Sequence, residues 1–77
     1  MTENELINHI KAFLGLFRVI KLCRSYRVKP EDALGELYVR LAVAARSKEI
    51  RMPAAWVWRN GMGFLKNWLR REERTLV

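Results

Sequence analysis

The C-terminal stretch, residues 53–72, constrains the fold most, because its apolar residues repeat with the period of an α-helix. Two neighbouring apolar lines follow the spacing i, i+4, i+7, i+11 of one helix face. They are Val57, Gly61, Phe64 and Trp68, and Trp58, Met62, Leu65 and Leu69. Pro53 suits the first turn of a helix, where no backbone N–H is needed. We therefore predict one helix over about residues 53–72, roughly 30 Å long.

The opposite side of this predicted helix is polar and basic. It carries Trp56, Asn60, Gly63, Asn67, Arg70, Arg71 and Arg74. Trp58 and Trp68 fall on the apolar lines and are predicted to be core residues. An exposed Trp56 beside Arg59 and Asn60 would offer a stacking surface to an unpaired base. It could equally pack on the preceding link, residues 47–52, and both interpretations stay open.

A first helix is predicted over about residues 3–25. Thr2, followed three residues later by Glu5, has the spacing of a capping box. Apolar residues then recur at spacings of four and three, as a helix that packs on another requires. The predicted inward residues are Leu6, Ile10, Phe13, Phe17 and Ile20.

A second helix is predicted over about residues 30–46. Pro30 and the acids Glu31 and Asp32 suit its first turn, where the helix dipole favours negative charge. The predicted inward residues are Leu34, Tyr38, Leu41 and Ala45. On an outer face, Glu36 and Arg40 have the i, i+4 spacing of an ion pair.

Size and composition fit these three helices into one domain. The chain has 77 residues, of which 51% are hydrophobic. This share is enough for a modest core and argues against a disordered chain. Two prolines and four glycines interrupt it. We predict an all-α fold, a compact three-helix bundle over residues 1–77.

The charge favours an anionic partner. The formal net charge is +7, and a strongly basic domain typically binds nucleic acid. Residues 1–38 carry six basic and five acidic side chains, whereas residues 39–77 carry nine and three. The excess therefore lies in the C-terminal half, although a basic surface that is only solvated would give the same count.

Few residues suit catalysis or metal binding. His9 is the only histidine and Cys23 the only cysteine, so we expect no enzyme activity, no intrachain disulfide, no cysteine zinc site and no cofactor. The N-terminus lacks the pattern of a signal peptide. No apolar run approaches the ~18 residues of a membrane span, and a cytoplasmic protein is expected.

Two segments resemble a known family. Residues 31–41 read EDALGELYVRL, and residues 56–59 read WVWR, followed by Asn67 and by a Leu-Arg-Arg sequence at residues 69–71. This order and separation resembles the second conserved region of bacterial sigma-70-type factors, especially the compact extracytoplasmic-function group. The resemblance covers about residues 6–74, with the first helix similar only in character.

The resemblance implies two binding surfaces. The second helix would dock on the clamp helices of the largest catalytic subunit of RNA polymerase, through Asp32, Glu36, Val39 and Arg40. The third helix and its preceding link would open the duplex at the minus-ten promoter element and hold flipped bases. The residues implied for DNA are Lys48, Arg51, Trp56, Arg59, Asn60, Lys66, Asn67, Arg70, Arg71 and Arg74.

The resemblance is to one region of such factors only. A separate partner protein is therefore expected to supply the domain that binds the minus-thirty-five element. Two alternatives stay open at this point. One is a sigma mimic or polymerase-binding regulator that does not read DNA, and the other is a simple basic helical protein that binds nucleic acid without polymerase. For any of these, a homodimer that extends the core is also conceivable.

Overall fold

The chain folds into helices joined by short links. A computed structural model describes residues 2–46 and 49–76, with side chains up to Glu72. Within these residues it contains four α-helices, a 3-10 helix and no strand. They are α1 (Glu3–Leu14), α2 (Phe17–Ser25), η1 (Pro30–Ala33), α3 (Leu34–Ala45) and α4 (Pro53–Leu76). The all-α fold class is confirmed, whereas the expected count of three helices is wrong.

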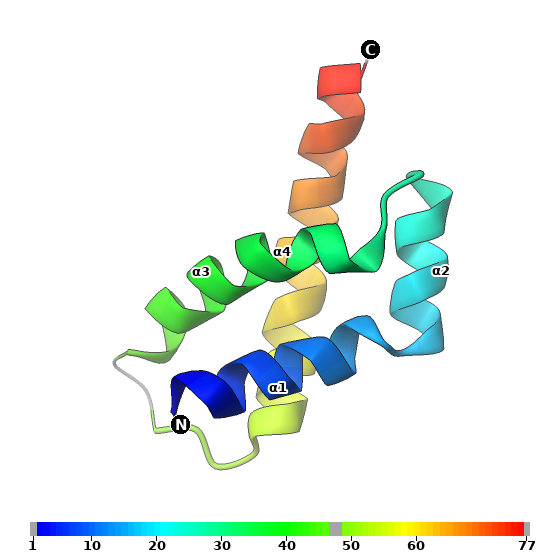
Figure 1. Ribbon diagram of the computed structural model, residues 1–77. Coiled ribbons are helices and arrows are strands. Elements are labelled where there is room, and N and C mark those ends of the chain that lie inside the picture. Colours follow the sequence, from blue (N-terminus) through cyan, green and yellow to red (C-terminus); the bar gives the residue numbers. More distant parts are fainter. Residues whose placement is uncertain (1, 47–48, 77) are drawn as a thin grey trace.

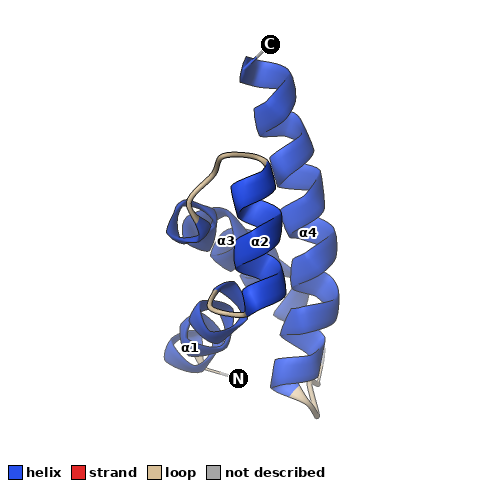
Figure 2. Cartoon of the chain, turned by 90° about the vertical axis from the view of Figure 1, so that its right-hand side faces the viewer, coloured by secondary structure: helices blue, strands red, loops and turns tan. Residues whose placement is uncertain are grey.

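The helices form two layers. α1 and α3 run side by side in opposite directions, and α4 crosses behind both of them (Figure 1). The view turned by 90° shows α4 as a layer of its own (Figure 2). The C-terminal turns of α4 extend beyond the other helices in both views. α2 stands at one edge of the molecule, beyond the ends of α1 and α3.

The predicted helix over residues 3–25 is in fact two helices. α1 ends at Leu14, the N–H of Gly15 donates to the carbonyl of Lys11, and Leu16 is extended, with φ −70° and ψ 138°. A straight helix over that range would be about 35 Å long, but its neighbour α3 has only 12 residues. The break turns α2 back across the end of the bundle, where it can bury a face.

The break changes which residues of this segment form the core. Buried as predicted are Leu6, Ile10 and Phe13. The predictions for Phe17 and Ile20 are wrong, because Phe17 is 77% exposed and Ile20 is half-buried. α2 instead buries Val19 and Cys23 completely. The capping residue is confirmed, since the hydroxyl of Thr2 accepts a hydrogen bond from the N–H of Glu5.

α2 ends in a Schellman motif built on an arginine. The N–H of Val28 donates to the carbonyl of Cys23 at 3.0 Å, and the N–H of Arg27 donates to that of Arg24 at 2.9 Å. These are the two bonds of that motif. Arg27 has a φ of 58° and is the only described non-glycine residue with positive φ. Because glycine is favoured there, the arginine carries a conformational cost.

The predicted helix over residues 30–46 begins as a 3-10 turn. η1 covers its first four residues, and α3 follows it. The buried line is Ala33, Leu37 and Leu41. Of the predicted inward residues only Leu41 is buried; Leu34, Tyr38 and Ala45 are half-buried. α3 packs against both α1 and α4, so its core line faces the angle between them and the other predicted residues flank it.

One hydrogen bond links the start of α1 to α3. The hydroxyl of Tyr38 donates to Oε1 of Glu3 at 2.7 Å. This bond raises the pKa of Tyr38, because deprotonation would place a phenolate beside a carboxylate.

α4 begins at Pro53 as predicted and continues to Leu76, four residues beyond the predicted end. Its fully buried residues include Val57, Leu65 and Leu69. Trp58 and Trp68 are half-buried and pack on the core.

α4 crosses α1 at a glycine. A Cβ built at Gly61 would lie 3.1 Å from Cε2 of Phe13, whereas one built at Gly63 meets nothing within 4 Å. Trp58 holds the Phe13 ring from another side, edge to face, with ring centroids 5.8 Å apart. The Phe13 ring is buried, so it has little room to retreat.

The two glycines should therefore respond in opposite ways to the same substitution. Gly63→Ala should stabilise the protein by up to about 1 kcal/mol, through helix propensity alone. Gly61→Ala gains the same propensity but overpacks the Phe13 ring, and a net loss of about 1 kcal/mol is expected. Urea unfolding followed by circular dichroism measures both. Equal stabilisation by the two would contradict the close packing at the crossing.

Arg27 gives a second stability prediction. Arg27→Gly should stabilise the protein by about 1 kcal/mol, because glycine adopts the left-handed conformation without steric cost. Arg24→Gly, three residues earlier and inside α2, is the control and should destabilise by a similar amount. Thermal unfolding of both variants tests this, and destabilisation by Arg27→Gly would show that the arginine has a stabilising role.

Candidate functional site

The residues assigned to polymerase binding lie on the outer side of η1 and α3. Asp32, in η1, and Val39, in α3, are exposed, while Glu36 and Arg40 are half-buried. Val39 is 59% exposed although it is apolar. Asp32 stands apart from the other three, which share one hollow.

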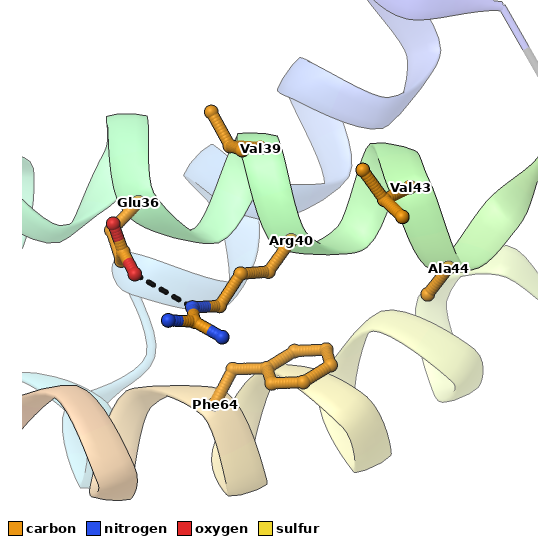
Figure 3. A pocket seen from close by; sticks show the side chains of 6 residues that line it. All are labelled: Glu36, Val39, Arg40, Val43, Ala44 and Phe64. Carbon is orange, nitrogen blue, oxygen red and sulfur yellow. Dashed lines mark hydrogen bonds and ion pairs between the residues drawn. The ribbon is translucent and has the colours of Figure 1, made fainter.

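This hollow, the α3 groove, lies between α3 and α4. It is open and has a volume of about 540 Å³. Its lining residues are Glu36, Val39, Arg40, Val43, Ala44 and Phe64. Figure 3 shows Val39 and Val43 on the outside of α3, with Phe64 of α4 below Arg40. The groove thus combines exposed apolar side chains with one pair of opposite charges.

The predicted pair of Glu36 and Arg40 is confirmed. Nε of Arg40 donates to Oε1 of Glu36 at 2.6 Å, and about a third of each side chain is exposed. Such a pair on a helix surface contributes only ~0.3–0.5 kcal/mol to stability. Its larger effect is to fix the direction of the guanidinium, whose terminal Nη groups have no hydrogen bond among the described residues.

Four residues assigned to DNA lie together at the start of α4. Arg51, Trp56, Arg59 and Asn60 line one open pocket of about 500 Å³. The other lining residues are Glu49, Ile50, Met52 and Ala55. We call this hollow the α4 pocket. It joins the link to the first two turns of the helix.

Trp56 has a place in both interpretations that the sequence left open. Its side chain is half-buried and packs on the core, and it also lines the α4 pocket with the link. Asn60 is held beside it, because Nδ2 of Asn60 donates to the carbonyl of Trp56 at 2.9 Å. The carbonyl oxygen of the Asn60 side chain has no described partner. An indole edge and an amide acceptor therefore share this pocket.

A basic line continues from the pocket along α4. Arg59, Lys66 and Arg70, spaced i, i+7, i+11, are exposed on the side opposite the buried Leu65. We call these three the α4 stripe. None of them has an ion pair or hydrogen bond among the described residues. Gly63 lies between the first two with open space around it, so an extended anion could approach the helix closely there.

The remaining assigned residues divide into two groups. Asn67 and Arg71 are exposed on α4, outside the α4 pocket. Lys48 and the side chain of Arg74 lie outside the described residues.

The sequence did not indicate Val43, Ala44 or Phe64 as part of a site. The spacing of Val43, one turn after Val39, could have indicated that both share an outer face of α3. Phe64 had no such signal, since it joins the groove only because α4 crosses α3.

The described part of the chain offers neither a metal site nor a membrane-spanning helix. It contains no group of three or more His, Cys, Asp and Glu residues that could hold a metal ion. None of its helices has the length and apolar character needed to cross a membrane. Cys23 is buried, and burial raises the pKa of its thiol, which disfavours the reactive thiolate.

Known proteins provide no relative that would assign a function. No protein-family model matches this chain, and no curated protein or solved structure is significantly similar to it. Function must therefore be inferred from the residues and their geometry.

Proposed function

We propose that this protein is a sigma-like module of transcription initiation. It docks on the clamp helices of RNA polymerase through the outer face of α3 and engages minus-ten promoter DNA through α4 and the link before it. One observation carries the proposal. Three of the four residues that the resemblance assigns to polymerase line the α3 groove, and six of the ten that it assigns to DNA belong to the α4 pocket and its stripe, a separate exposed surface.

The α3 groove suits a helical protein partner. Helices that dock in grooves place apolar side chains in the hollow and polar ones at its edge. Val39 and Val43 are 59% and 58% exposed, so covering them removes apolar surface from water. The Glu36–Arg40 pair at the edge has free donors for an acidic or amide group of the partner. A clamp-helix coiled coil meets these requirements.

The α4 surface suits partly opened DNA. A row of cations follows a phosphate backbone, and an aromatic or amide group beside it receives an unstacked base. The α4 stripe supplies the cations, and the α4 pocket supplies Trp56 and Asn60. In this proposal a separate protein supplies contacts to the minus-thirty-five element.

One prediction from the proposed function concerns polymerase docking. Val39→Asp places an unpaired charge in the apolar part of the groove, and we expect at least tenfold weaker binding to core RNA polymerase. Asn8→Asp, an exposed position on α1, is the matched control and should bind as the wild type. Binding is measured by biolayer interferometry, with core polymerase that lacks the clamp-helix coiled coil as a second control.

The outcomes separate the candidate functions. If the protein binds intact core polymerase but not the polymerase that lacks the coiled coil, the sigma-like role is supported. If the protein binds neither polymerase but is retained on plain DNA in a salt-dependent way, it is a basic nucleic-acid-binding protein and the polymerase role is refuted.

Another prediction from the proposed function concerns the α4 stripe. On forked promoter DNA in complex with core polymerase, Lys66→Gln should reduce the slope of log affinity against log salt by about one, the effect of one lost phosphate contact. Lys11→Gln, an exposed lysine on α1, removes the same charge and should leave the slope unchanged. Equal slopes for both variants would indicate a regulator that docks on polymerase without contacting DNA.

A further inference from the structure

α2 and the turn after it form a basic surface that the proposed function does not use. Residues 6–30 contain no acidic side chain. Their basic side chains are Lys11, Arg18, Lys21, Arg24, Arg27 and Lys29. All six are exposed. The net charge of residues 1–38 is nevertheless close to zero, because acidic residues before and after this segment balance its positive charge.

An exposed phenylalanine is aligned with two of these cations. Phe17, Lys21 and Arg24 follow the spacing i, i+4, i+7 of one helix face. Val19 and Cys23, on the opposite face, are completely buried. We call Phe17, Lys21 and Arg24 the α2 stripe. An exposed phenylalanine alone is unremarkable on a protein surface, but this one shares a helix face with two cations.

The cations at the C-terminal end of α2 lack an anionic partner in the part of the chain that the structure describes. Neither Lys21 nor Arg24 has an ion pair or hydrogen bond among the described residues, and the same holds for Arg27. Like charges one turn apart destabilise a helix slightly. Arg27 adds a conformational cost through its positive φ. An external anion beside these side chains would relieve the repulsion between them.

We propose that the α2 stripe binds single-stranded nucleic acid. Lys21 and Arg24, one turn apart, contact phosphates of the backbone, and Arg27 contacts it beyond the end of the helix. Phe17 stacks on an unpaired base beside them. Cationic side chains that follow the backbone, combined with an aromatic platform, are the usual means of binding a single strand without sequence preference.

Two other occupants fit less well. A duplex offers phosphates but no unstacked base for the Phe17 ring. A membrane-surface helix inserts a continuous apolar face between lipids, but the apolar face of α2 is packed in the core, with Val19 and Cys23 fully buried. Only Phe17 and Leu16 are exposed large apolar residues here.

The surface is distinct from those of the proposed function. α2 lies at an edge of the molecule (Figure 1), and none of its residues lines the α3 groove or the α4 pocket. Binding at this surface needs no polymerase, and its test can fail or succeed whatever the polymerase measurements show.

The experiment measures fluorescence anisotropy of a labelled oligothymidylate with the purified full chain, without polymerase. Phe17→Leu should weaken binding roughly tenfold, because it keeps an apolar side chain but removes stacking, whereas Phe17→Tyr should bind as the wild type. Changing Lys21 and Arg24 together to Gln should reduce the salt slope by about 1.4. Asn8→Asp, at an exposed position outside all of these surfaces, should change neither quantity.

Duplex DNA and lipid vesicles are the comparison ligands. Binding of duplex should not respond to Phe17→Leu. If Phe17→Leu binds oligothymidylate as tightly as the wild type does, the strand binds elsewhere, and the proposal is overturned. It is also overturned if Phe17→Leu instead abolishes binding to vesicles of phosphatidylserine and phosphatidylcholine. Circular dichroism confirms folding of each variant, which is expected because Phe17 is exposed.

Arg27 provides a readout that a structural role would not give. Arg27→Gly should raise the melting temperature and at the same time weaken binding to oligothymidylate by severalfold, through loss of one phosphate contact. If the variant is more stable and binds the strand equally well, Arg27 is not part of the surface and the proposed extent of the site is wrong.

Discussion

The close packing of α1 on α4 determines how the rest of the molecule is arranged. At Gly61 the absence of a side chain lets the Phe13 ring lie against the α4 backbone, and Trp58 holds that ring by an edge contact. α3 then packs along α1 and also on α4. Because α3 is held there, its outer residues meet Phe64 and form the α3 groove. The groove therefore depends on a glycine and an aromatic ring that are not part of it.

The first helical segment shows where sequence periodicity succeeds and where it fails. The spacing that predicted Leu6, Ile10 and Phe13 as core residues is local, and these residues are buried. The same spacing continues to Phe17, but the core does not, since α3 is too short to cover a helix over residues 3–25. Periodicity describes one helix at a time and contains no information on the length of its partner, so the break at Gly15 could not be predicted from it.

The candidate sites divide in the same way. The Glu36–Arg40 pair is an interaction within one helix, and its spacing alone predicted it. The α4 pocket needed only the nearness of the link to the helix that follows, and four of the assigned DNA residues line it. Phe64 enters the α3 groove through the crossing of two helices, and Phe17 became a surface residue through the helix break. These tertiary effects have no signature in the spacing of either residue.

The surface charges contribute little to holding this fold together. One ion pair, Glu36–Arg40, is present among the described residues, and surface pairs of this kind contribute little to stability. A net charge of +7 on 77 residues adds self-repulsion that the core must overcome. In the two proposals made above, the cations of the α2 stripe and the α4 stripe serve to attract an anionic partner. They lie on different helices, so the two proposals together give nucleic acid two separate contact surfaces on one small domain.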